Sequence, residues 1–354
     1  MGEHIDYNDG FVMPAAMDRR LSIVAGPISS DEIILCTEQD KKVFRFRLND
    51  PLLPRGDWTD YVVGVLAHWM ELNASVCGLA ISIASDIPLG AGLSSSAALE
   101  VATATLLEVA WEMRLHPRAK ALACQAVENH YVGMPCGIMD QFAVTMADKG
   151  HFLLLDCQTN TFEQIPVDSH FPSLLVINTN IRHALTEGCY AERRSQCESV
   201  LLVLGQTSWR SVSMTQLMDK SEELSDVQLR RGRHVISEIK RTRDAADCVR
   251  KGNMMELGKL LYASHQSLRY DYEVSCKEAD WIVDRMGGLG EGGGVLGCRM
   301  TGAGFGGCVV CLVSPDAVSD IIRQLDSDYR KKFNLEADFF LTSPSEGCRA
   351  WIPS

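Results

Sequence analysis

With 354 residues, 46% of them hydrophobic and 23% charged, the chain has the composition of a globular protein and the length of two domains. The net charge of −12, with no block of like charges, argues against a nucleic-acid-binding surface, and no apolar run reaches the roughly 18 residues of a membrane-spanning helix. The 13 cysteines, an odd number with no signal peptide before them, fit reduced thiols, so we expect a cytoplasmic protein that binds neither nucleic acid nor membrane.

The first ten residues, M-G-E-H-I-D-Y-N-D-G, are polar and turn-like. Residues at a chain end are usually frayed, and this is one interpretation of the segment. Alternating apolar residues then predict strands over residues 33–36 and 43–48. Residues 58–72 carry apolar side chains at helical spacing and predict a helix.

The stretch over residues 88–100, P-L-G-A-G-L-S-S-S-A-A-L-E, organises the chain. It follows a predicted strand over residues 78–85 and precedes apolar residues at helical spacing, so it lies at a strand-to-helix junction. Its glycines allow close approach of a ligand to the backbone, and its serines stand beside the free N–H groups of a helix start, which bind phosphate. The alternative is an ordinary turn capped by serine.

A second helix is predicted over residues 117–132, stopped by Gly133, and it carries Glu128. By its residue type alone, Glu128 is an exposed helix glutamate. The loop that follows leads into a helix start that contains Asp140. Carboxylates favour helix N-termini electrostatically, so Asp140 taken alone is as well explained by helix stability as by function.

The second half of the chain begins after strands predicted over residues 152–155 and 174–177, and we place a boundary between domains 1–167 and 168–354. A mostly helical region follows, in which a basic run over residues 230–243 predicts a solvated helix face. Residues 287–297 are glycine-rich and predict a mobile surface loop. Residues 301–307, T-G-A-G-F-G-G, precede a strand over 308–313, and a bulged hairpin is the simplest interpretation.

Six segments in order resemble the GHMP kinase superfamily, and within it the galactokinases. They are G-E-H-I-D-Y-N-D-G, P-L-G-A-G-L-S-S-S-A-A-L-E, G-M-P-C-G-I-M-D-Q-F, R-H-A-L-T-E-G-C-Y-A-E-R-R-S-Q-C-E, L-R-Y-D-Y-E-V-S-C and R-M-T-G-A-G-F-G-G-C. The resemblance therefore covers essentially the whole chain. It implies an α+β, two-lobed GHMP kinase fold, with ATP and the sugar in the cleft between lobes, and a monomer.

The resemblance also implies the roles of individual residues in phosphoryl transfer. Asp140 would take the proton from the C1 hydroxyl of galactose, and Ser96 and Glu128 would hold Mg²⁺. The residues that would cradle the ATP phosphates are Gly90, Gly92, Ser94, Ser95 and Ser96. The residues that would contact galactose, besides Asp140, are Glu3, His4, Asp6, Gly137 and Tyr190.

One feature departs from the family pattern. Galactokinases carry an arginine in a strand shortly before G-E-H, and this sequence has none there, so we expect the natural protein to begin upstream of Met1. The absent arginine leaves a non-catalytic regulator that binds galactose and ATP as an alternative function, against which the intact Ser96-Ala97 step argues. A kinase for another sugar, such as N-acetylgalactosamine, is a further alternative, and Tyr190 with the R-R-S-Q-C-E that follows it favours galactose.

Overall fold

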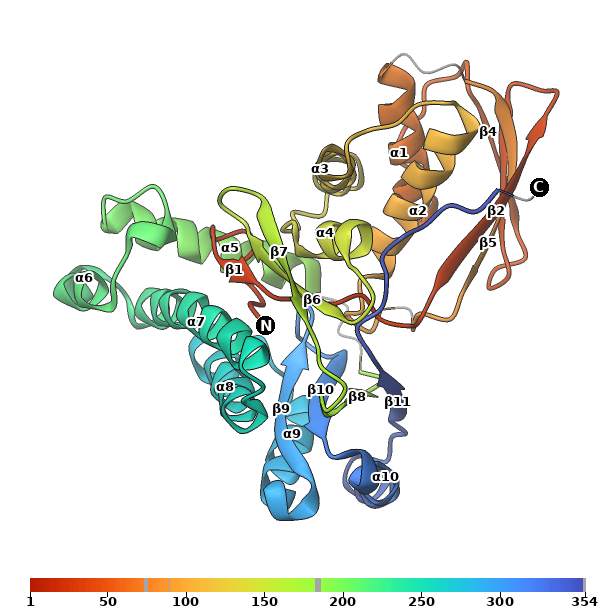
Figure 1. Cartoon of the computed structure of the whole chain (residues 1–354). Coiled ribbons are helices and arrows are strands. Elements are labelled where there is room, and N and C mark those ends of the chain that lie inside the picture. Colours follow the sequence, from red (N-terminus) through yellow and green to blue (C-terminus); the bar gives the residue numbers. More distant parts are fainter. Residues whose placement is uncertain (73–75, 89, 182–185, 353–354) are drawn as a thin grey trace. The chain divides into compact units, whose positions relative to one another are not determined.

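The computed structural model describes residues 1–72, 76–88, 90–181 and 186–352 (Figure 1). Its internal contacts divide the chain into two compact units, which we describe one at a time. The first unit contains Met1–Ala15, Leu89–Leu93 and Asp148–Ser345. The second contains Ala16–Pro88, Ser94–Ala147 and Glu346–Ser354.

These units interleave along the sequence, whereas we predicted contiguous halves, 1–167 and 168–354. Strand pairing explains the difference at the start, because β1 (Phe11–Val12) pairs with β6 (His151–Asp156), and β6 pairs with β7 (Thr161–Pro166). The end of the chain returns to the second unit, where the Gly347 amide donates to the Ala147 carbonyl. A single boundary near residue 167 therefore does not separate the two units.

The second unit is a four-stranded sheet with helices packed on one face. The strand order is β2-β5-β3-β4, with β3 parallel to β5 and the other pairs antiparallel. The strands are β2 (Leu21–Ile28), β3 (Glu32–Thr37), β4 (Val43–Arg47) and β5 (Gly78–Ser85). The helices are α1 (Thr59–Glu71), α2 (Ser95–Ala110), α3 (Pro117–Val127) and α4 (Met139–Met146). Alternate residues of β5, such as Ile81, enter the core with Trp69 of α1, as a half-buried strand requires. The strands and helices predicted in this region are confirmed.

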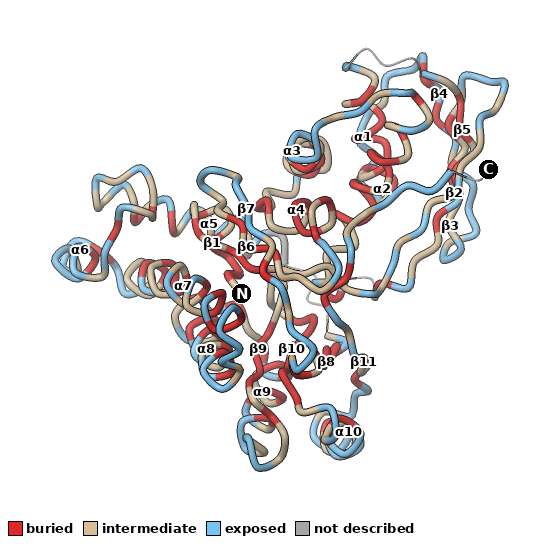
Figure 2. The backbone as a smooth tube through the Cα atoms, viewed as in Figure 1, coloured by how far each residue is buried: buried red, intermediate tan, exposed pale blue. Residues whose placement is uncertain are grey.

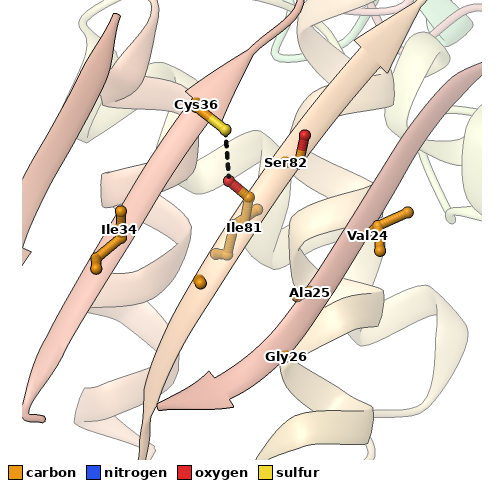
Figure 3. Close-up of a pocket in the computed structure, with 8 residues that line it drawn as sticks. Val24, Ala25, Gly26, Ile34, Cys36, Ile81 and Ser82 are labelled. Carbon is orange, nitrogen blue, oxygen red and sulfur yellow. Dashed lines mark hydrogen bonds between the residues drawn. The ribbon is translucent and has the colours of Figure 1, made fainter.

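The opposite face of this sheet carries a shallow apolar depression (Figure 3). It is lined by Val24, Ala25, Gly26, Ile34, Cys36, Ala80, Ile81 and Ser82. The only titratable side chain in this lining is the Cys36 thiol, which donates to the Ile81 carbonyl at 3.6 Å. The depression therefore offers mainly apolar packing surface, with a single thiol in its lining.

The first unit contains an antiparallel sheet of order β11-β8-β10-β9 and the three-stranded sheet of β1, β6 and β7. The strands of the former are β8 (Ser173–Asn178), β9 (Val295–Thr301), β10 (Cys308–Val313) and β11 (Asp338–Thr342). The helices are α5 (Thr186–Val203), α6 (Met214–Asp219), α7 (Asp226–Arg250), α8 (Met254–Ser267), α9 (Lys277–Leu289) and α10 (Val318–Phe333). The inner strands β8 and β10 are buried almost throughout (Figure 2). Within the described residues, none of the helices is both long and apolar enough to cross a bilayer.

The glycine-rich segment 287–297 is not the loop that we predicted. Helix α9 continues to Leu289, a short 3₁₀ turn follows, and β9 begins at Val295. Gly297 serves close packing: a Cβ atom on it would lie 2.4 Å from the Gly258 Cα of α8, and one on Gly258 would lie 1.9 Å from the Leu296 carbonyl oxygen, whereas one on Gly288 or Gly292 would meet no atom within 4 Å. Here glycine permits a helix to contact a strand backbone, so glycine content was misleading as a sign of mobility.

The start of the chain is packed rather than frayed, and the basic face of α7 is not uniformly solvated. Ile5 is fully buried, and Glu3 and His4 are 4% and 3% exposed. On α7, Arg231 and His234 are buried, because their polar atoms find partners on other elements; Arg231, for example, donates to Glu273 at 2.8 Å. The first interpretation assumed that a chain end is frayed, and the second that basic residues face water, and both fail where buried polar side chains bond to partners on other elements.

Candidate functional site

Two glycine-rich segments of the first unit lie against each other. Gly90 and Gly92 have positive φ angles of 66° and 70°, conformations that favour glycine. The segment between β9 and β10 approaches them so closely that a Cβ atom on Gly302 would lie 2.5 Å from the Gly92 carbonyl oxygen. A Cβ atom on Gly307 would similarly lie 2.8 Å from the Ala91 carbonyl oxygen. This segment is a hairpin connection, as the simplest interpretation predicted. Its glycines also allow its backbone to lie directly against the backbone of Ala91 and Gly92.

Glu3 is held by side chains of the strand that leads into this hairpin connection. Its carboxylate forms an ion pair with Arg299 and accepts a hydrogen bond from the Thr301 hydroxyl at 3.0 Å. Burial alone would raise the pKa of Glu3, but the Arg299 guanidinium brings it below its usual value. Glu3 is therefore an ionised, fully engaged carboxylate.

His4 is a neutral, buried imidazole whose two nitrogens are both bonded within the protein. Burial lowers its pKa to about 4. Nε2 lies 3.0 Å from the Ala303 carbonyl, which can only accept, so the proton resides on Nε2. Nδ1 then accepts from the Tyr7 hydroxyl at 2.8 Å, and Tyr7 in turn accepts from the Tyr272 hydroxyl at 3.0 Å. This fixes the ring and leaves neither nitrogen free for a ligand.

Asp6 and Tyr190 complete the sequence-predicted group in this unit. Asp6 is half-buried and accepts from the Tyr7 amide at 3.1 Å. The ring of half-buried Tyr190 lies 5.2 Å from that of His4 and 5.1 Å from that of Tyr7, centroid to centroid. Tyr272, which sequence reasoning did not single out, stacks on His4 from another element at 5.0 Å. The structure thus brings Glu3, His4, Asp6 and Tyr190 into one polar and aromatic cluster.

The second unit contains the start of α2, where the three serines predicted to bind phosphate lie. Ser94 is its N-cap residue, with a φ angle of 58°, and among the described residues it makes no side-chain capping bond. The first turn of α2 holds no acidic side chain of its own, so no carboxylate within the helix compensates its positive end. Ser95 and Ser96 open the helix with half-buried side chains, and the Ser96 hydroxyl is hydrogen-bonded to Glu128.

Glu128 is buried, which corrects the expectation of an exposed helix glutamate. It opens a π-helical turn, η1 (Glu128–Val132), that ends α3, and such turns are frequent at functional sites. Gln141 donates to its Oε2 atom at 2.6 Å, and the Cys136 thiol donates to the same atom at 3.4 Å. Burial and the charge of Asp140 raise the pKa of Glu128.

Asp140 lies in the first turn of α4 and is half-buried, and Gly137 is buried in the loop before it. The electrostatic influence of Asp140 reaches both Glu128 and the fully buried Glu100 of α2. Sequence reasoning missed Glu100, because a glutamate inside a helix carries no signal of burial. The structure therefore places Ser96 and Asp140 near Glu128 in the second unit.

This acidic cluster suits a divalent cation. Besides burial, the groups that shift the pKa values of Glu100 and Glu128 are carboxylates, an amide, a thiol and a hydroxyl. Among the described residues, no basic side chain contributes to either shift. In the part of the chain that the structure describes, no group of three or more His, Cys, Asp or Glu side chains could hold a metal ion by itself. Mg²⁺ usually takes one or two carboxylates and completes its shell with water and substrate phosphates, so the oxygens of Ser96 and Glu128 fit it.

A pH-dependent contribution to stability follows from His234 on α7. It contacts the Ser267 hydroxyl at 2.9 Å and the Glu3 carbonyl at 3.3 Å, and burial lowers its pKa from 6.5 to about 3. Between these values the unfolded chain holds a proton that the folded chain lacks, so this contribution decreases as pH falls. As pH falls, we expect the unfolding free energy of His234→Gln to decrease less steeply than that of the parent. Near pH 5 the two slopes should differ by roughly 1 kcal/mol per pH unit. Parallel pH profiles in urea denaturation would contradict this.

Family models match three parts of the chain. The model described as the galactokinase galactose-binding signature matches residues 1–27. The models for the N-terminal and C-terminal domains of GHMP kinases match residues 60–148 and 245–331. Glu3, His4 and Asp6 thus lie within the first match and the acidic cluster lies within the second, whereas Tyr190 lies outside all three.

Individual proteins match over nearly the whole chain. The galactokinase of Homo sapiens is 38% identical over 359 residues, which cover 99% of this chain and 89% of that protein. The galactokinase of Canis lupus familiaris is 37% identical over the same extent. The crystal structure of Lactococcus lactis galactokinase complexed with galactose has a TM-score of 0.93 at 31% identity, covering 98% of this chain and 91% of that one. Methanococcus jannaschii mevalonate kinase, at a TM-score of 0.68 and 21% identity, shares the fold.

Proposed function

The chain belongs to the galactokinase family of GHMP kinases, and on that premise we propose that it phosphorylates the C1 hydroxyl of α-D-galactose with ATP. The α+β GHMP kinase fold predicted from the sequence is confirmed. The observation that carries the proposal is the near full-length match to galactokinases together with the likeness to a galactose-bound galactokinase. The non-catalytic regulator is not favoured, because the curated relatives are enzymes of this name.

In the reaction we propose, Asp140 accepts the proton of the C1 hydroxyl as that oxygen attacks the γ-phosphoryl group. Asp140 is suited to this because it is a half-buried carboxylate in the first turn of α4, and an ionised carboxylate oxygen can accept a proton. The start of α2, with Ser94, Ser95 and Ser96, supports the phosphates through backbone N–H groups. Gly90 and Gly92 let the phosphates approach the backbone.

Ser96 and Glu128 would hold Mg²⁺, which when bound neutralises charge on the transferred phosphoryl group. For the sugar, Glu3 is already bonded to Arg299 and Thr301, and His4 is already bonded to Ala303 and Tyr7. We therefore assign Glu3 and His4 the role of holding the surrounding groups in place and not of binding the sugar directly. Asp6, Gly137 and Tyr190 remain the proposed direct contacts to sugar hydroxyls. A site with fixed polar groups rejects an epimer strongly, because its own groups are left unpaired. A monomer in the cytoplasm is the setting we expect.

Replacing either proposed metal ligand should change the metal requirement and spare the sugar site. We expect Ser96→Ala and Glu128→Ala each to raise the Mg²⁺ concentration for half-maximal activity by roughly 10–100-fold. Galactose binding without nucleotide, measured by calorimetry, should stay at the parent value. Unchanged Mg²⁺ titration curves in both variants would remove these residues from the metal site.

The product identifies the reaction. The chain is incubated with ATP, Mg²⁺ and galactose, and the phosphorylated product is examined by ³¹P and ¹H NMR. We expect a sugar phosphate whose phosphorus couples to the anomeric proton, with one ADP formed per product. Phosphate at another carbon, or galactose binding without any product, would contradict the proposal.

A further inference from the structure

The side-chain amide of Gln141 lies between two buried glutamates of the second unit. Its Nε2 atom donates to Glu128 Oε2 at 2.6 Å and to Glu100 Oε2 at 3.2 Å. An amide nitrogen carries two hydrogens, and the two carboxylate oxygens lie closer to Nε2 than the Cys136 sulfur at 3.9 Å, so the carboxylates use both. Gln141 and Glu100 are each fully buried, and Glu128 is 5% exposed. One amide group thus connects α2, η1 and α4.

Two acceptor atoms of this group are left without a donor. Among the described residues, Glu100 Oε1 and Gln141 Oε1 are both buried and have no hydrogen-bond partner. Both belong to side chains that are already bonded to each other through Nε2 and Oε2. Rotating the amide by half a turn does not help, because its oxygen would then point at carboxylate oxygens. A single proton on the Glu100 carboxyl supplies the missing donor for the pair.

The charge balance favours the same proton. Glu100 is buried near two other carboxylates, Glu128 and Asp140, and burial first and Glu128 second raise its pKa well above the usual value. The cation that we place at Ser96 and Glu128 compensates the carboxylate that it contacts. Glu100 makes its hydrogen bond to Gln141 instead, so it is the group that gains most from being neutral.

We propose that Glu100 is a neutral carboxylic acid that forms a reciprocal pair with the Gln141 amide, and that this pair positions Glu128 for a divalent cation. In the pair, Gln141 Nε2 donates to Glu100 Oε2 and the Glu100 hydroxyl on Oε1 donates to Gln141 Oε1. The second amide hydrogen is thereby directed at Glu128 Oε2. Glu100 and Gln141 are positioning residues that touch neither substrate nor metal, and their role rests on the proposed function.

The identity of the buried group can be tested by exchanging acid for amide. In Glu100→Gln, the new amide donates to Gln141 Oε1 and accepts from Gln141 Nε2, so the reciprocal pair survives. In Gln141→Leu, a side chain of similar size cannot bond to Glu128. We expect Glu100→Gln to bind metal as the parent does, and Gln141→Leu to weaken metal binding by roughly 10–100-fold, the usual effect of losing a hydrogen-bond partner of a metal ligand.

The readout is Mn²⁺ binding in the presence of ADP, followed by the electron paramagnetic resonance of free Mn²⁺, which needs no sugar and no turnover. The affinity for ADP without metal should be equal in the parent and both variants. A variant that had lost its structure would bind ADP more weakly, so this measurement serves as the control for folding. In addition, an infrared difference spectrum between parent and Glu100→Gln at neutral pH should show the C=O stretch of one protonated carboxylic acid in the parent only.

Other results overturn the inference in distinguishable ways. If Glu100→Gln weakens Mn²⁺ binding or fails to fold, Glu100 carries a needed negative charge and is not a neutral acid. If Gln141→Leu binds Mn²⁺ as the parent does, the pair does not position Glu128. If the parent itself binds no Mn²⁺ with ADP, both the proposed metal site and the positioning role are wrong. If the parent binds Mn²⁺, a contrary result in the variants contradicts this inference alone and leaves the proposed function standing.

Discussion

Replacing Asp140 by asparagine should lower kcat for galactose phosphorylation by about 10²–10⁴-fold, the range usual for loss of a general base. Asparagine keeps the size of the side chain and its place in the first turn of α4 but cannot accept the proton of the C1 hydroxyl. Asp140 is the only carboxylate in the segment over residues 133–142, so no neighbour in the segment replaces it. Steady-state ADP release with galactose measures the loss.

The matched control is Asp320→Asn on α10, where the carboxylate is 80% exposed in an ion pair with Arg323. This exchange should leave kcat and stability unchanged, because exposed ion pairs contribute little. Calorimetric binding of galactose and of nucleotide should show that Asp140→Asn retains both ligands. An Asp140→Asn enzyme within about tenfold of the parent kcat would remove Asp140 as the base.

Replacing Arg299 by methionine should lower the free energy of unfolding by about 3–5 kcal/mol, the cost of breaking a buried ion pair. The Arg299 side chain is 1% exposed, pairs with Glu3 and lies 3.8 Å from Glu238 Oε1. Glu238 keeps its bond from Arg241 Nε at 2.7 Å, but among the described residues Glu3 keeps only the Thr301 hydroxyl and the α-amino group of Met1 at 3.7 Å. The variant therefore leaves a poorly compensated carboxylate inside the protein.

The matched control is Arg285→Met, which removes an ion pair with Asp328 that is about one-third exposed, with 2.8 Å between Nη2 and Oδ2. We expect a loss of only ~0–1 kcal/mol from this change. Urea denaturation of both variants and the parent, fitted with a common slope, gives the comparison. Equal losses in the two variants would show that the Arg299 network contributes no more than a surface pair.

Local features of the chain were predictable where one short stretch determines them. The strand–turn–helix over residues 78–100 and the helix stop at Gly133 follow from side-chain alternation and from turn chemistry within a few residues. The acidic cluster was predictable only in part. The resemblance indicated Ser96, Glu128 and Asp140, but Glu100 and Gln141 become evident only when three helices converge.

Features that depend on distant partners escaped sequence reasoning. Glu3 is ordered because Arg299, at the other end of the chain, is buried beside it, and no spacing rule connects the two. The glycine-rich run over residues 287–297 indicated a mobile loop by composition, whereas Gly297 of β9 lies against Gly258 of α8 and permits the two backbones to come close. In each case the deciding energy is burial or close packing between elements, which a sequence pattern does not contain.

The most direct test of the proposed function is ADP release measured over a panel of sugars. Purified chain is given Mg²⁺ and ATP with galactose, glucose, N-acetylgalactosamine or mevalonate, and kcat/KM is determined for each. We predict turnover with galactose, a much lower kcat/KM with its epimer glucose and with N-acetylgalactosamine, and none with mevalonate. A higher kcat/KM for any of the other three, or no ADP release above the sugar-free rate with galactose, would contradict the assignment of this chain as a galactose kinase.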